Sequence, residues 1–229
     1  MDFFKNIGVL ITNEKYMGML LEGLGKTLLV SVFAAILGLL LGTLVAMVGL
    51  SEGRFSKIPK AICKVYVTVI RGTPMALQLF IMAYAIFAIR GFPKEITAIV
   101  AFGINSGAYV SENIRAGILS VDIGQTEAGR ALGLARGTTM RKIVIPQAIK
   151  NVIPAIGNEL IALIKETSIV SMIGMYDLTQ AAKVIGAGNN MASYIVPMSV
   201  AACFYLAIVY LLAFAIKKIE KRLRASDKR

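Results

Sequence analysis

Long apolar runs separated by short polar and basic segments constrain this chain more than any other feature of its sequence. Hydrophobic residues make up 57% of the 229 residues, whereas an ordinary soluble domain is about 45–50% apolar. A run of about 20 apolar residues is long enough to cross the hydrocarbon core of a bilayer as a helix. The chain is therefore predicted to be an all-α integral membrane protein.

The positions of the apolar runs predict five transmembrane helices within a single transmembrane domain, residues 1–229. The predicted spans cover residues 24–50, 58–89, 95–119, 152–173 and 193–216. The segment 120–146, between the third and fourth spans, is polar and basic and is predicted to lie outside the membrane. The polar, glycine-bearing segment 177–190 is predicted to be a loop.

Lysine and arginine are concentrated in alternate connections of this arrangement. They lie mainly in the connection after the first span, around residues 120–146 and in the C-terminal tail. Cytoplasmic loops carry an excess of these residues, so the N-terminus is predicted outside and the C-terminus inside, with 120–146 in the cytoplasm. The formal net charge of +12 thus belongs to loops beside the lipid bilayer. Nucleic-acid binding is a poor interpretation of it.

The second span is too long for one straight crossing, and Arg71-Gly72-Thr73-Pro74 interrupts it. Pro74 disfavours helical backbone at Thr73 and removes a backbone donor. A charge and a broken helix at membrane depth are tolerated where they line a cavity or are buried in protein. One hypothesis is a kink beside a translocation path; the alternative is a tilted helix with a purely structural kink.

The first and third spans carry signals for close packing and for charge pairing. Gly38 and Gly42 in the first span have the spacing of small residues that lets helices approach closely, and the third span repeats it. Glu112 and Arg115 are one helical turn apart and are predicted to pair, which would offset part of the cost of burying either charge.

The polar segment 120–146 is predicted to contain a short amphipathic helix. Asp122 and Gly124 bracket a turn, residues 125–134 follow as the helix, and Gly133 and Gly137 end it. A helix this short is not stable alone in water and must dock on something. It is predicted to insert into a groove on a partner, the alternative being a solvated loop helix. Its small apolar face consists of Ala128, Ala131, Leu132 and Leu134.

The chain after this helix is predicted to return to the membrane in two steps. Residues 138–150 have the pattern of an amphipathic helix at the surface, which Pro146 would bend. Pro154 and Gly157 are then predicted to open the fourth span.

The sequence EAGRALGLARGTTMRKIVIP at residues 127–146 resembles the cytoplasmic loop of permease subunits of ATP-driven (ABC) importers. That family's pattern is Glu-Ala-Ala, three residues, Gly, nine residues and Ile-x-Leu-Pro, and every spacing is kept. Gly129 stands for the second Ala and Ile145 for Leu, both conservative departures. Three further stretches resemble the subfamily of permeases for polar amino acids and cystine: residues 71–79, 105–118 and 146–174.

The resemblance implies the type I importer fold, in a prokaryotic cell membrane. Five-span subunits would pair as homo- or heterodimers, bind two cytoplasmic ATPase subunits and receive an amino acid from an extracellular or periplasmic binding protein. This chain would then be a transport subunit and not an enzyme. It would hold no cofactor, because the ATPases bind ATP and Mg²⁺. The residues that the resemblance implies for coupling to the ATPase are Gly124, Glu127, Ala128, Gly129, Leu132, Gly133 and Pro146.

Polar residues near the middle of the second, third and fourth spans are the candidates for substrate contact. A zwitterion that loses its water needs a cation or amide donors for its carboxylate, and oxygen acceptors for its ammonium. Arg71 suits the first role and Glu159 the second, whereas amides both donate and accept. The alternative makes these residues structural, with Arg71 bonded to carbonyls freed at the Pro74 break and Glu159 paired with a neighbouring span. The candidates are Arg71, Thr73, Asn105, Ser106, Asn158 and Glu159.

Two other classes of membrane protein are alternatives for this sequence. An ion-coupled secondary transporter or channel subunit would also carry charges in its spans, and Glu112, Glu159 and Glu166 would suit proton or ion sites. That hypothesis leaves the 127–146 pattern unexplained. A membrane enzyme or a metal site is disfavoured because the chain has no histidine and its two cysteines, Cys63 and Cys203, lie far apart in the sequence.

Overall fold

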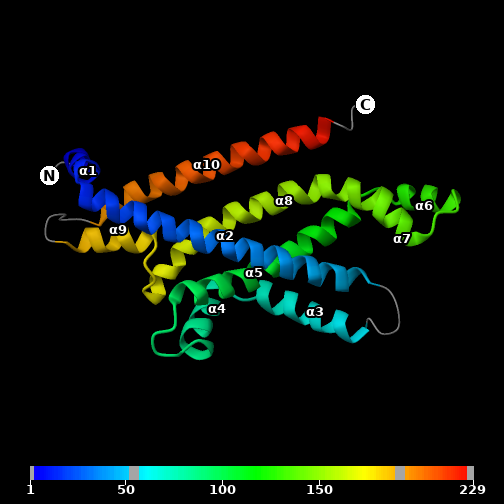
Figure 1. Ribbon diagram of the computed structural model, residues 1–229, viewed down its shortest axis with the longest axis horizontal. Coiled ribbons are helices and arrows are strands. Elements are labelled where there is room, and N and C mark those ends of the chain that lie inside the picture. The colour runs from blue at the N-terminus through cyan, green and yellow to red at the C-terminus, as the bar shows by residue number, and fades with distance from the viewer. Residues whose placement is uncertain (1–2, 52–56, 189–193, 226–229) are drawn as a thin grey trace.

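The computed structural model describes residues 3–51, 57–188 and 194–225, and in this part of the chain every regular element is helical. The molecule is elongated, and its long helices lie side by side along its length (Figure 1). A hairpin that contains α6 and α7 protrudes at one end, opposite the end that holds α1 and α9.

Helix α2 (Glu14–Leu50) is the longest element, with 37 residues. It begins ten residues before the predicted first span, after the short helix α1 (Phe3–Thr12), because the Asn13 side chain accepts a hydrogen bond from the Tyr16 amide and caps it. At 1.5 Å per residue α2 is about 55 Å long, which exceeds the hydrocarbon core of a bilayer. By length and composition, α2 and α10 (Ile195–Ala225) can each cross a membrane.

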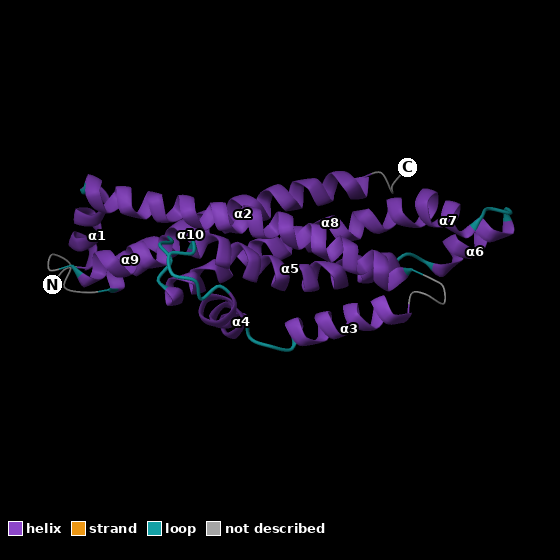
Figure 2. Cartoon of the chain, turned by 60° about the horizontal axis from the view of Figure 1, so that its bottom comes forward, coloured by secondary structure: helices purple, strands orange, loops and turns teal. Residues whose placement is uncertain are grey.

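The predicted interruption of the second span is confirmed. Helix α3 (Lys57–Arg71) stops at the Pro74 break, and the chain resumes as α4 (Met75–Ile81), continued by a π-helical turn at Met82–Ile86. The two parts are bent by 107° relative to each other, so the pair is a third candidate span if it is counted as one (Figure 2).

Helix α5 (Lys94–Leu119) packs along α2, and this pair forms the most extensive helix–helix contact of the described chain. A Cβ added to Gly42 would lie 2.6 Å from Cγ1 of Val110, and one added to Gly38 would lie 2.8 Å from Cβ of Ser106. The close packing predicted from the glycine spacing is therefore confirmed.

Pro154 and Gly157, which were predicted to open the fourth span, do not begin a helix. Helix α7 (Arg136–Thr139), a π-helical turn at Met140–Val144 and α8 (Ile145–Glu166) follow one another without interruption. Pro154 lies inside α8. An interior proline removes one backbone hydrogen bond, but α8 packs against α5 and α10, and this packing holds the helix together.

After α8 the chain forms a 3₁₀ turn, Thr167–Ile173, and then helix α9 (Leu178–Ala187), where a loop was predicted. The Asp177 carboxylate caps α9 by accepting hydrogen bonds from the amides of Thr179 and Gln180, at 3.0 and 2.8 Å. The buried residues of α9 repeat at helical spacing and pack with α1, α2 and α10: Leu178, Ala181, Ala182 and Ile185. The loop prediction is therefore wrong for this stretch, and residues 189–190 of it lie outside the described part.

Candidate functional site

The break between α3 and α4 is held by the side chain of Gln78. Its Nε2 donates to the carbonyl of Ile70 at 2.8 Å and to the hydroxyl of Thr73 at 2.7 Å. The Thr73 hydroxyl in turn donates to the carbonyl of Val69 at 2.9 Å. These bonds satisfy carbonyls that the interrupted helix leaves free, which is the condition for non-helical backbone at membrane depth.

Gln78 was not among the predicted residues, although a lone amide inside an apolar run, one turn after Pro74, is a readable signal. It also connects the break to α5, because Nδ2 of Asn105 donates to Oε1 of Gln78 at 2.9 Å. Asn105 is 6% exposed and its neighbour Ser106 is 3% exposed, so both polar side chains are buried.

Arg71, at the end of α3, faces α5. Its guanidinium carbon lies 5.2 Å from the centre of the Tyr109 ring, and Nη1 lies 3.5 Å from Oε2 of Glu112. Glu112 is also bound by Arg115 through two contacts, at 2.7 and 3.0 Å, which confirms the predicted pair. The alternative in which Arg71 bonds the carbonyls freed at the break is wrong, because Gln78 bonds them instead.

Helix α8 contributes Glu159, whose carboxyl lies near enough to Ser106, Arg71 and Glu166 to interact with them electrostatically. The predicted residues on α3, α5 and α8 therefore come together, with the exception of Asn158. That side chain is exposed on α8, and the described contacts do not join it to the others.

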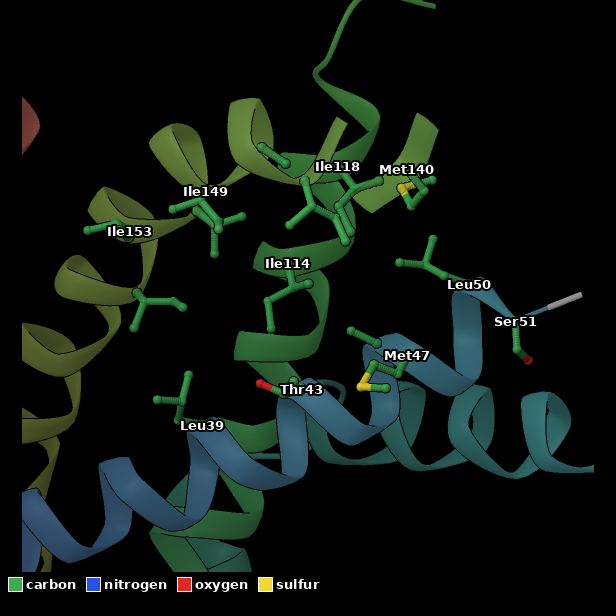
Figure 3. Close-up of a pocket in the computed structure, with 15 residues that line it drawn as sticks. Leu39, Thr43, Met47, Leu50, Ser51, Ile114, Ile118, Met140, Ile149 and Ile153 are labelled. Carbon is green, nitrogen blue, oxygen red and sulfur yellow. The ribbon is translucent and has the colours of Figure 1, made fainter. Parts of the chain in front are cut away.

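Two cavities of the described chain are lined mainly by apolar side chains. One, about 220 Å³, lies beside the break, and Thr73 and Gln78 are among its lining residues. A larger one, about 780 Å³, lies between α2, α5 and α8 and is lined almost wholly by apolar groups such as Leu39, Ile114 and Ile149 (Figure 3). An apolar cavity of this kind lacks partners for a zwitterion. The cluster at the break is thus the better candidate for polar ligand contact.

The predicted short helix is confirmed as α6 (Ile123–Ala131). The Asp122 carboxylate accepts from the Gly124 amide at 2.7 Å at its start. At its end the amide of Gly133 donates to the carbonyl of Arg130, and the amide of Leu134 donates to that of Gly129. With Gly133 at a φ of +75°, this is the Schellman ending of a helix.

The prediction that Gly137 helps to end α6 is wrong, because Gly137 lies inside α7. Gly133 alone supplies the left-handed backbone that the ending requires. The alternation of α6, a glycine turn and α7 produces the hairpin at the end of the molecule (Figure 1).

One side of α6 packs against the helical segment that leads into α8 and against α8 itself. A Cβ on Gly129 would lie 2.6 Å from Cγ2 of Thr139, and Nε2 of Gln147 on α8 donates to Oε1 of Gln125 at 3.2 Å.

The other side of α6 faces outward. Glu127 and Ala128 are exposed there, and Leu132 at the end of the helix is 79% exposed. Pro146, in the first turn of α8, is exposed as well. The apolar face predicted from Ala128, Ala131 and Leu132 is therefore left uncovered by this chain.

The fold, the polar cluster at the break and the protruding α6 hairpin define an all-helical membrane subunit. The chain belongs to the family of binding-protein-dependent transport system inner membrane components, whose sequence model matches residues 36–225.

Curated relatives match nearly the whole chain. It is 42% identical over 209 residues to a putative glutamine transport system permease protein of Rickettsia bellii, covering 90% of this chain and 94% of that one. It is 42% identical over 211 residues to the arginine transport system permease protein of Bacillus subtilis, covering 91% and 94%. It is 36% identical over 209 residues to the glutamine transport system permease protein of Escherichia coli K12, covering 90% and 93%.

Solved structures agree with this membership. The crystal structure of an amino acid ABC transporter with histidines matches with a TM-score of 0.85 at 36% identity, covering 97% of this chain and 99% of that one. An inward-facing structure of the MetNI methionine ABC transporter matches with a TM-score of 0.75 at 20% identity, covering 93% and 99%, and shows the fold alone.

Proposed function

We propose that this chain is the membrane permease subunit of an ATP-driven importer for a polar amino acid. The observation that carries the proposal is the polar cluster at the broken span, anchored on the buried Asn105, within a fold whose relatives are named as glutamine and arginine permeases. The chain is a transport component and not an enzyme, as members of its family are the membrane components of binding-protein-dependent systems.

The arrangement we propose has five spans: α2, the pair α3–α4, α5, α8 and α10. Helices α5 and α8 carry charges, and the Glu112–Arg115 pair on α5 reduces the cost of placing two of them in a bilayer. Basic residues gather at the end that holds the α6 hairpin, which supports an N-terminus outside and a C-terminus in the cytoplasm.

The substrate path is proposed to run past the cluster at the break. Arg71 supplies a cation for the carboxylate of an amino acid, and Glu159 supplies an acceptor for its ammonium. Thr73, Asn105 and Ser106 add neutral polar groups beside them. Asn158 belongs to the same path in this proposal, because its side chain is exposed on the helix that carries Glu159.

Coupling to nucleotide is proposed to run through α6 and α8. The exposed side of α6, with Glu127, Ala128 and Leu132, would insert into a groove on an ATPase subunit. Gln147 ties α6 to the first part of α8, and at 1.5 Å per residue Glu159 lies about 18 Å farther along the same helix. Helix α8 would thus transmit a displacement of the hairpin to the polar cluster.

The complete assembly in this proposal contains a second permease subunit, two ATPase subunits and an external binding protein for the amino acid. ATP and Mg²⁺ would be held by the ATPase subunits. Alternating access follows if ATP binds the outward-facing state more tightly than the inward-facing state, because a ligand shifts an equilibrium only through such a difference.

The test is uptake by proteoliposomes that contain this subunit together with its ATPase and binding protein. Internal ATP should drive accumulation of an amino acid from a panel of glutamine, glutamate, arginine and histidine, and ionophores that collapse ion gradients should leave the rate unchanged. Uptake that needs an ion gradient and ignores ATP would assign the chain to the secondary transporters instead.

A further inference from the structure

A further cavity, about 510 Å³, lies between α2, α3 and α5 and is lined by both charged and apolar side chains. Its charged lining is unbalanced, because one carboxylate, Glu112, faces four basic side chains. The basic residues are Lys60, Lys64, Arg71 and Arg115.

The two arginines already share the carboxylate. Glu112 accepts two hydrogen bonds from Arg115 and lies 3.5 Å from Arg71. Among the described residues, no carboxylate lies within 4.0 Å of the ammonium groups of Lys60 or Lys64. Unpaired cations beside a membrane interior are costly, so these two lysines provide a place for an anion.

The rest of the lining has the character of an acyl-chain surface. Val45, Ala46 and Val67 form apolar parts of the wall. Lys60 and Lys64 are one turn apart on α3, and α3 begins toward the end of the molecule that holds α6 (Figure 1). A cavity with a cationic mouth and apolar walls matches an amphiphile that has a phosphate head group.

We propose that this cavity binds the phosphate of an anionic phospholipid from the membrane leaflet on the α6 side. Lys60 and Lys64 contact the phosphate, and the two arginines remain on Glu112, so that one phosphodiester charge meets two otherwise unpaired cations. In the orientation proposed above this is the cytoplasmic leaflet. The lipid site itself depends on the cavity and not on the transport reaction.

The chain carries a natural reporter for this cavity, since Cys63 lines it between the two lysines. The second cysteine, Cys203, is exposed on α10 and is removed as Cys203→Ser. The rate at which a small maleimide labels Cys63 is then measured in the assembled transporter in detergent, with phosphatidylglycerol or with phosphatidylcholine of the same acyl chains. Phosphatidylglycerol should slow the labelling at concentrations where phosphatidylcholine has no effect.

The matched variants separate the lysines from general surface charge. A basic residue near an anionic lipid surface contributes about fivefold to affinity, so the double variant Lys60→Gln, Lys64→Gln should need about 30-fold more phosphatidylglycerol for half-protection. The control variant Lys57→Gln changes a lysine on the same helix that does not line the cavity, and it should match the parent. If the double variant does not fold, Lys64→Gln alone should show a shift of about fivefold.

Four results would overturn the proposal. Equal protection of Cys63 by the two lipids would show that the cavity has no anion site. So would an unchanged phosphatidylglycerol concentration for half-protection in the lysine variants. Protection by inorganic phosphate and not by phosphatidylglycerol would assign the site to a soluble phosphate compound. Protection by a mixture of glutamine, glutamate and arginine would make the cavity part of the transport path. Failure of amino acid uptake itself would leave the lipid result intact, because labelling does not require transport.

Discussion

Gly133 allows the coupling role of the α6 hairpin to be tested through the backbone alone. Its φ is +75°, and an added Cβ would meet nothing within 4 Å. A side chain at this position therefore acts by backbone strain and not by a clash. Left-handed backbone costs an L-residue about 1–2 kcal/mol, less for Asn and more for β-branched residues. The Schellman ending, with the bonds from Gly133 to Arg130 and from Leu134 to Gly129, would be weakened accordingly.

A cost of about 1–2 kcal/mol lowers the population of the native hairpin by a factor of about 5–30 relative to rearranged forms. In the reconstituted transporter, the amount of amino acid imported per ATP hydrolysed should fall in the order Gly133→Asn, Gly133→Ala, Gly133→Val. The unfolding midpoint of the membrane part should change little, because the hairpin protrudes from it. Normal coupling in Gly133→Val would refute the reasoning, and so would equal damage from Asn and Val, which would show that size matters and not φ.

Three further outcomes are expected, each from a separate contact. Gln78→Met leaves a buried carbonyl and a buried amide without partners, so the free energy of unfolding should fall by about 2–4 kcal/mol, seen as a lower midpoint in detergent; an unchanged midpoint would contradict the assigned bonds. Gly42→Ala should destabilise the subunit through its clash on α5, whereas Gly49→Ala, which meets nothing, should not, as the same assay shows. A cysteine at Ser120 should react with an impermeant reagent from the cytoplasm and one at Val184 from outside; the reverse would break the proposed orientation.

The features predicted correctly from the sequence depend on interactions between near neighbours in the chain. The break at Pro74, the Glu112–Arg115 pair and the ending of α6 at Gly133 each follow from residues within one or two helical turns. The close approach of α2 and α5 is the exception, since it is long-range, but its glycine spacing is itself a local pattern.

The features that were missed depend on contacts across the fold. Pro154 remains helical because α8 is packed between α5 and α10, which no local rule on proline includes. Helix α9 is short and is capped by Asp177. Its apolar residues stabilise it only because α1, α2 and α10 bury them. Gln78 donates to the carbonyl of Ile70, eight residues away, and also accepts from Asn105 on another helix. The sequence marks Gln78 as a lone amide after Pro74, but its partner on α5 follows only from the fold.

The central claim is that the polar cluster contacts the substrate. It is tested by the binding of a labelled amino acid to the solubilised transporter without the external binding protein. Glu159→Gln should weaken binding of the transported amino acid about tenfold, because the substrate ammonium then meets a neutral amide oxygen in place of a carboxylate. Glu220→Gln, which removes the carboxylate partner of Arg224 at 3.0 Å on α10, is the matched control and should bind like the parent. Unchanged affinity in folded Glu159→Gln would contradict the account and place the substrate elsewhere in the membrane.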